Sequence, residues 1–220
     1  YPLPKGPRRK NLEAHCHKSG LTISDIFLCP PFYGRTLTAG ITGIIGKLRY
    51  LFIAPELLNI LNEDEIESVI AHEAGHVRMK HMYYYVLLFL GFPLSLFLVS
   101  NLFYLSFYGI PDFIIQHIYF GDLPPNILSL AVLALLTAFI LFYLRIFFGI
   151  ISRNFERQAD LFVFQVVGHP LHLISSLEKI SQYAGGIKDI ANWHHFSISQ
   201  RIKFLQDCQR DSHQIKIHQK

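Results

Sequence analysis

Residues 62–76 read Asn-Glu-Asp-Glu-Ile-Glu-Ser-Val-Ile-Ala-His-Glu-Ala-Gly-His and predict one amphipathic helix. Asn62 and Glu65 have the spacing of a capping box, and acidic residues in the first turn suit the positive end of the helix dipole. Apolar residues at helical spacing form a stripe made of Ile66, Val69, Ile70 and Val77. We therefore expect this helix to pack against a core and to carry the chemistry of the chain.

The last five residues of this stretch form the pattern H-E-x-x-H. Residues four apart share a helix face, so the imidazoles of His72 and His76 can reach one zinc ion. Glu73 is offset towards the water that such an ion would hold. The same pattern also arises by chance on surface helices, so it becomes a metal site only if a third ligand is found.

Glu156 and Asp160 offer that ligand on a second expected helix. A zinc site of the His₂Glu type takes three protein ligands and leaves the fourth position for water. The spacing of four lets Glu156 bind zinc while Asp160 accepts a hydrogen bond from a ligating imidazole. The alternative is a solvated acidic pair on a charged helix, which is the usual meaning of this spacing.

Two apolar stretches separate the histidines from Glu156. Residues 82–111 and 123–144 contain no charged residue, and about 20 residues in a helix cross the hydrocarbon core of a bilayer. We predict transmembrane helices at about residues 83–108 and 124–146. The alternative is a pair of buried helices in a soluble protein, which seldom run so long without a charge. An even number of spans returns Glu156 to the side of His72 and His76.

Composition supports a membrane protein. Hydrophobic residues make up 51% of the chain and charged residues 16%, against about a quarter charged in soluble domains. The net charge is +4, and all 20 Lys and Arg residues lie outside residues 82–144, which indicates membrane topology rather than nucleic-acid binding. The positive-inside rule puts both flanks in the cytoplasm. We expect an integral protein of a bacterial inner membrane whose active site faces the cytoplasm.

The rest of the chain predicts an α+β fold that is mainly helical. Strands are expected at residues 23–29 and 48–53, and helices at residues 12–18, 171–183 and 198–207. We expect one protease domain formed by residues 1–81 and 152–220, with residues 82–151 inserted between its zinc-ligand motifs as a transmembrane hairpin.

These parts predict peptide-bond hydrolysis. Zinc would activate a water and polarise the scissile carbonyl, and Glu73 would take the proton and pass it to the leaving amine. A second electrophile would stabilise the oxyanion, and the candidates are His195 and Arg201. Composition alone would place both of them on the surface.

The order of motifs resembles the integral-membrane zinc proteases of the HtpX and CAAX prenyl protease family, which are gluzincins. The resemblance is carried by Arg49-Tyr50, Leu57-Leu58, residues 65–76, the two spans, Ser152-Arg153 with Glu156, Ala159-Asp160 and residues 193–205. It implies a zincin-like fold with one zinc per chain. It also implies that His72, His76 and Glu156 bind the metal, that Glu73 is the base and that Asp160 supports a ligand. His195 and Arg201 match a His and an Arg that the family places near the active site.

Two features depart from the family pattern. Many relatives carry Asn-Ala in the strand before the catalytic helix, where this chain has Thr38-Ala39-Gly40, so the details of substrate binding by strand addition are open. Relatives also have membrane helices ahead of the catalytic domain. We therefore expect the chain to be a fragment that lacks N-terminal spans.

The expected partners are a polypeptide substrate, in particular a membrane protein, and the lipid bilayer. The oligomeric state stays open. One alternative keeps the enzyme and makes prenylated C-terminal peptides the substrate. Another is a catalytically silent receptor or scaffold, against which the complete set of metal ligands and Glu73 argues.

Overall fold

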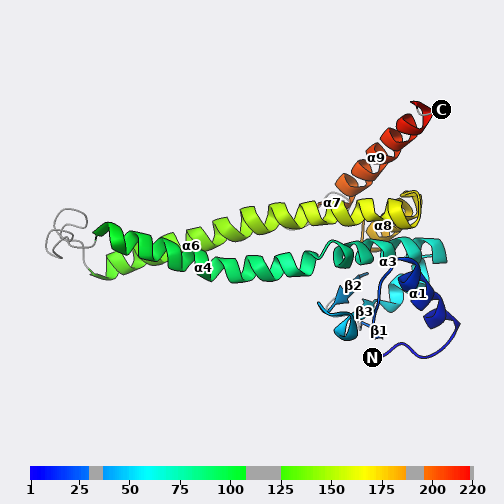
Figure 1. The fold of residues 1–220 in the computed structure, drawn as a ribbon, viewed down its shortest axis with the longest axis horizontal. Helices are drawn as coiled ribbons and strands as arrows, with labels where there is room; N and C mark the ends of the chain where they lie inside the picture. Colours follow the sequence, from blue (N-terminus) through cyan, green and yellow to red (C-terminus); the bar gives the residue numbers. More distant parts are fainter. Residues whose placement is uncertain (30–36, 108–124, 187–195, 219–220) are drawn as a thin grey trace. The chain divides into compact units, whose positions relative to one another are not determined.

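The computed structural model describes residues 1–29, 37–107, 125–186 and 196–218 (Figure 1). The chain divides into two compact units, the first formed by Tyr1–Tyr83 with Ile151–Lys220 and the second by Tyr84–Ile150. The first unit combines a small sheet with helices, and the second is helical throughout its described part. The chain is therefore mainly helical with one small sheet, as the sequence predicts.

The sheet of the first unit has three strands in the order β1-β3-β2, which are β1 (Asp25–Leu28), β3 (Tyr50–Ile53) and β2 (Ala39–Thr42). β1 pairs with β3 in parallel, and β2 pairs with β3 in the antiparallel sense, with Ala39 opposite Ile53. Leu51 and Ile53 of β3 are fully buried, because alternate side chains of a strand point to the same face. In this strand order β2 pairs with β3 alone among the described residues, which makes it an edge strand.

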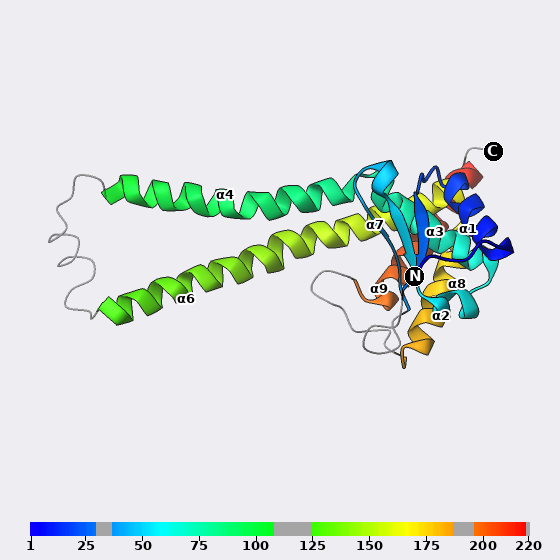
Figure 2. The ribbon, with the colours of Figure 1, turned by 90° about the horizontal axis from the view of Figure 1, so that it is seen from below.

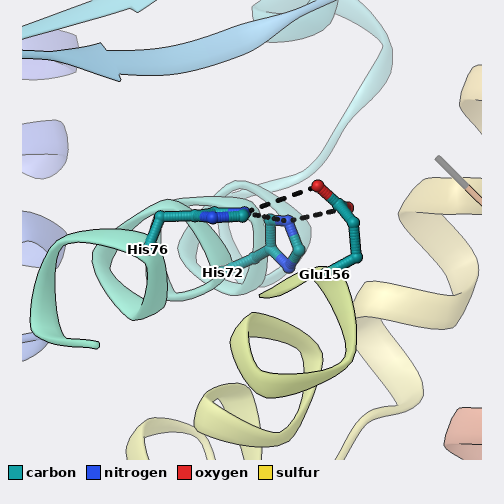
Figure 3. Close-up of side chains that lie close together, drawn as sticks. All are labelled: His72, His76 and Glu156. Carbon is teal, nitrogen blue, oxygen red and sulfur yellow. Dashed lines mark hydrogen bonds and ion pairs between the residues drawn. The ribbon is translucent and has the colours of Figure 1, made fainter. Parts of the chain in front are cut away.

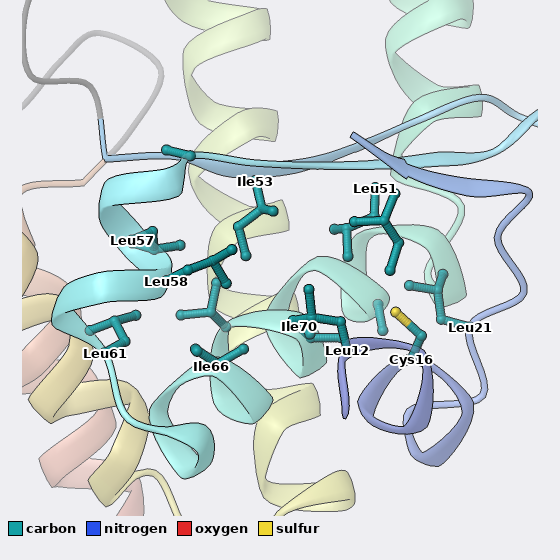
Figure 4. Packing of buried hydrophobic residues seen from close by; sticks show 14 of the residues in the cluster. Leu12, Cys16, Leu21, Leu51, Ile53, Leu57, Leu58, Leu61, Ile66 and Ile70 are labelled. Carbon is teal, nitrogen blue, oxygen red and sulfur yellow. The ribbon is translucent and has the colours of Figure 1, made fainter. Parts of the chain in front are cut away.

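In the described part of the first unit, six α-helices accompany the sheet. They are α1 (Pro7–Lys18), α2 (Pro55–Ile60), α3 (Glu63–Arg78), α7 (Gly149–Val166), α8 (Leu171–Tyr183) and α9 (Ile198–His218), of which α7 begins two residues inside the second unit. Leu12 of α1, Leu57 of α2 and Ile70 of α3 meet the buried residues of β3 in one hydrophobic core (Figure 4). This core fixes α3 against the inner face of the sheet.

The start of α3 has the predicted capping box. The Asn62 side chain accepts a hydrogen bond from the Glu65 amide at 2.9 Å, and the Glu65 carboxylate accepts one from the Asn62 amide at 2.8 Å. The same carboxylate accepts hydrogen bonds from Ser175 and Lys179 of α8. One acidic side chain thus caps α3 and also ties it to a helix more than a hundred residues further along the chain.

The second unit is built from α4 (His81–Phe107), which begins in the first unit, and α6 (Pro125–Tyr143), followed by the π-helical turn η3 (Leu144–Phe148) (Figure 2). The Tyr143 hydroxyl donates a hydrogen bond to the Leu88 carbonyl at 2.9 Å, and the ring of Phe92 contacts those of Phe139 and Tyr143. These contacts join α4 to α6.

Two helical segments are long and apolar enough to cross a membrane. The first is His81–Leu102, with a mean hydropathy of 1.9, and the second is Leu133–Val166, with 2.3. In the most apolar part of the first segment no residue is buried inside the protein, and in that of the second segment only 6% are. A core helix of a soluble protein would be mostly buried, so this exposure favours contact with lipid.

Candidate metal centre

Helices α3 and α7 approach closely at Gly75. A Cβ atom on Gly75 would lie 2.9 Å from the Cα of Ala159, which is closer than real Cβ contacts come, and 3.1 Å from the Cβ of Phe162, which is tighter than an ordinary contact. Only glycine lets the two backbones come this near. The approach carries Glu156, one turn before Ala159 on α7, to the face of α3 that bears both histidines.

The three side chains His72, His76 and Glu156 converge on one point (Figure 3). Their facing atoms all lie within 4.8 Å of one another. The two Nε2 atoms are 3.3 Å apart, and each lies 3.7 Å from an oxygen of Glu156. Tetrahedral ligands about 2.0–2.1 Å from zinc stand about 3.3–3.4 Å from each other. The donor set and its spacing therefore fit a zinc ion.

The pKa values of the two imidazoles are shifted in opposite directions, with opposite effects on metal binding. Burial, followed by the neighbouring His72, lowers the pKa of His76 to about 3, so its ring is neutral and offers a lone pair. Burial and the charge of Arg201 lower the pKa of His72, but the hydrogen bond to Asp160 and its charge outweigh them, and the net shift is upward. A metal ion would displace the additional proton that this shift favours on His72.

Asp160 and Arg201 support the cluster from behind. An Asp160 oxygen lies 2.9 Å from Nδ1 of His72, so the carboxylate can accept the Nδ1 hydrogen while Nε2 faces the centre. Arg201 of α9 donates two hydrogen bonds to Asp160, at 2.6 and 3.1 Å, and its Nη1 lies 3.5 Å from Glu156. Burial lowers the pKa of Arg201, yet the surrounding carboxylates, Asp160 first, raise it above its ordinary value.

Two further residues, Glu73 and His195, were predicted to belong to the site. Glu73 is half-buried, and its carboxylate is near enough to Arg201 to contribute to the upward shift of that residue's pKa. His195 lies outside the described residues. Among the described residues, the structure brings all the predicted site residues together.

A family comparison decides what kind of chain this is. The model of peptidase family M48 matches residues 34–209, which is most of the chain and includes every ligand candidate. The chain belongs to peptidase family M48. The resemblance read from the motifs is confirmed, and the two exposed apolar helices accord with a membrane member of this family.

Two known proteins are similar to the M48 chain. It is 25% identical over 222 residues to a protein of Oryza sativa subsp. japonica named CAAX prenyl protease 1 homolog, covering 94% of this chain and 49% of that protein. The crystal structure of S. mikatae Ste24p has a similar fold, with a TM-score of 0.66 and 23% identity over 93% of this chain and 50% of that one. The M48 chain therefore spans about half the length of the relatives that it matches.

One contact of the M48 site was not expected from the sequence. Nδ1 of His81 lies 2.9 Å from Nδ1 of His76, and Nε2 of His81 lies 2.9 Å from Oε1 of Gln158. His81 is the first residue of α4, and Lys80 before it adopts a left-handed conformation with φ of 59°. This turn, which helical periodicity does not foresee, directs the His81 ring back to the end of α3. In the sequence, the only indication of this contact was a histidine at position 81, close to the H-E-x-x-H pattern.

Proposed function

We propose that the chain is the catalytic part of a zinc-dependent endopeptidase in a membrane, which hydrolyses peptide bonds of membrane or membrane-associated proteins. The observation that carries the proposal is the convergence of His72, His76 and Glu156, with spacings suited to tetrahedral zinc. Membership of peptidase family M48 supports it. One zinc ion per chain would be held by these three side chains.

When bound, zinc would supply an acidified water and a Lewis acid for the scissile carbonyl. Glu73 follows directly after the first histidine and is the group we assign as general base, taking a proton and delivering it to the leaving amine. Asp160 holds the Nδ1 hydrogen of His72 and thereby its orientation.

Arg201 and His195 are assigned to the developing oxyanion. The permanent charge of Arg201 and its position beside Glu156 support this role, although two of its donors are engaged by Asp160. We therefore propose that Arg201 both holds Asp160 and contributes positive potential to the reaction centre. For His195 the support is the match to the family motif in the sequence.

The substrate that suits this site is an extended polypeptide. β2 is an edge of the sheet and contacts α3, the helix that carries His72 and Glu73. β3 pairs with one side of β2, and within the described ranges no strand pairs with the other. An extended segment could add there as a further strand and lie along the metal centre. Thr38-Ala39-Gly40 would contact the substrate backbone.

A more specific candidate substrate is a prenylated protein C-terminus. The similarity to the protein named CAAX prenyl protease 1 homolog supports it. Comparing cleavage of a prenylated peptide with cleavage of the same peptide lacking the prenyl group would separate this candidate from a protease of general membrane proteins. A silent receptor of the same fold would cleave neither peptide.

For the membrane arrangement we propose that residues 1–81 and 152–220 form the protease domain and lie in the cytoplasm. Residues 82–151 would form the transmembrane hairpin. The absence of Lys and Arg from residues 82–144 and their abundance on both flanks support this orientation. A location in a bacterial inner membrane stays a prediction.

The proposal is tested with Glu73→Gln in the detergent-solubilised protein. We expect wild type to bind one zinc and to cleave an unfolded protein substrate, and Glu73→Gln to retain the zinc but lose cleavage. Glu63→Gln removes an exposed carboxylate from the same helix and should change neither property. Wild-type protein that cleaves equally well after complete removal of metal would refute the proposal.

A further inference from the structure

His81 is a buried polar ring with three defined contacts. It is 1% exposed, and its two nitrogens face His76 and Gln158, each at 2.9 Å. Its flat face stacks on Phe155, with ring centroids 4.0 Å apart and an angle of 8° between the planes. Phe155 and Gln158 lie on α7 on either side of Glu156. The turn that supplies the third ligand candidate therefore also clamps His81.

Metal binding through Nε2 of His76, together with the contacts of His81, would determine where each proton lies. For Nε2 of His76 to bind a metal it must carry a lone pair, so the neutral ring holds its hydrogen on Nδ1. That hydrogen points at Nδ1 of His81, which must accept it. The remaining hydrogen of His81 is then on Nε2, where it is donated to the oxygen of Gln158. Both hydrogens shared between these three side chains then have an acceptor.

The opposite arrangement is incompatible with metal binding. If Gln158 donated to Nε2 of His81 through its amide group, His81 would hold its hydrogen on Nδ1 and donate it to His76. A neutral His76 would then carry its own hydrogen on Nε2, the atom that faces His72 and Glu156. With its oxygen 2.9 Å from Nε2 of His81, Gln158 is oriented to match the first of these two states.

We propose that His81 and Gln158 are positioning residues that form a hydrogen-bonded relay, which fixes the His76 imidazole in the tautomer and orientation that present Nε2 to zinc. The inference rests on the proposed zinc site. His72 is held by a carboxylate, Asp160, whereas His76 is held by a second imidazole. The two histidines of one motif thus have supports of different chemistry.

The test is zinc affinity, measured by competition with a chromogenic chelator on the solubilised full chain. His81→Phe keeps a flat ring against Phe155 but has no acceptor, and loss of such a support should weaken zinc binding by about 10–100-fold. His81→Asn places an oxygen near the position of Nδ1 and should recover most of that loss. Gln158→Met should weaken zinc binding while the His81 ring stays in place. His172→Phe replaces a half-buried histidine of α8 as the matched control.

Each outcome decides between the relay and simple packing. The relay is overturned if His81→Phe or Gln158→Met binds zinc as tightly as wild type, or if His81→Asn is as weak as His81→Phe. If His81→Phe does not fold, Gln158→Met and His81→Asn carry the decision, with the Co²⁺ absorption spectrum reporting the ligand geometry. Wild-type protein that binds no zinc would refute the proposed function instead, so the two failures are distinguishable.

Discussion

The Cα of Ala159 lies 2.9 Å from the point that a Cβ atom on Gly75 would occupy. This is a contact between the backbones of two helices, and it is located between the two ligand-bearing turns of α3 and α7. A side chain at position 75 could be accepted only if one helix moved away from the other.

We expect Gly75→Ala to destabilise the protein by about 1–3 kcal/mol, as is usual when a methyl group is forced into a packed interface. The displacement would also separate Glu156 from His76, so zinc affinity should fall. Unfolding by denaturant and zinc titration measure the two effects. Gly168→Ala is a useful comparison for zinc affinity, because no atom lies within 4 Å of its Cβ position. Any loss of stability in that variant reflects the positive φ of 89° at Gly168. Full zinc affinity in Gly75→Ala would contradict the role given to this contact.

Arg201 and Asp160 form a buried ion pair with two hydrogen bonds. Arg201→Met removes one partner and leaves the carboxylate without its cation, which typically costs about 3–5 kcal/mol of stability. Adding Asp160→Asn to Arg201→Met removes the stranded charge and should restore part of this loss. A double-mutant cycle of unfolding free energies provides the measurement. Strictly additive effects of the two substitutions would show that the pair is not coupled.

Glu65 gives the protein a dependence on acidic pH. Burial raises the pKa of Glu65, but hydrogen bonds from Lys179, Ser175 and the Asn62 amide lower it more, so the folded pKa lies below its ordinary value of 4.5. A depressed carboxylate pKa contributes stability that is complete above the ordinary value and is lost as the pH falls through the folded value. Stability should therefore decline as the pH falls below the ordinary value of 4.5 and through the lower pKa of the folded state.

Substitution isolates this contribution. Glu65→Gln should be less stable than wild type by about 1–3 kcal/mol at neutral pH and should show a weaker decline in acid, which unfolding curves at several pH values would measure. Glu178→Gln, on the helix that bears Ser175 and Lys179, serves as the control. Parallel pH profiles for wild type and Glu65→Gln would exclude Glu65 as the source.

The charge pattern around the apolar stretches predicts their orientation. A reporter fused after Asp122 should be extracytoplasmic, and one fused after Asp160 should be cytoplasmic, because the positive flanks stay inside. If the fused reporter is an enzyme that is active on only one side of the membrane, its activity shows directly on which side each fusion point lies. The reverse result would place the catalytic unit outside.

Local signals in the sequence were sufficient for much of the fold. The capping box at Asn62 and the bounds of residues 171–183 follow from periodicity and from residues that interact within one turn, and both are present in the structure. The proximity of Glu156 to the two histidines could also be predicted from the sequence, because an even number of spans returns the chain to the same side of a membrane. The predicted contact between Asp160 and His72 is present as well.

Other features depend on distances that no local pattern encodes. The close approach at Gly75 depends on Ala159, and the relay through His81 depends on Gln158. The first helix begins at Pro7, five positions before the predicted start. The prediction missed these positions because the first turns of α1 have almost no apolar periodicity. Long-range pairs of this kind become visible only when the helices are in place.

The ligand candidates stand on opposite sides of the apolar helices in the chain, and this has a consequence for biosynthesis. A ribosome releases His72 and His76 first, then both hydrophobic segments, and only afterwards Glu156 and Arg201. A nascent or prematurely terminated chain thus holds two of the three ligands and cannot complete the centre. Completion of the proposed centre therefore has to follow synthesis of both apolar helices, so an unfinished chain would lack the activity proposed for it.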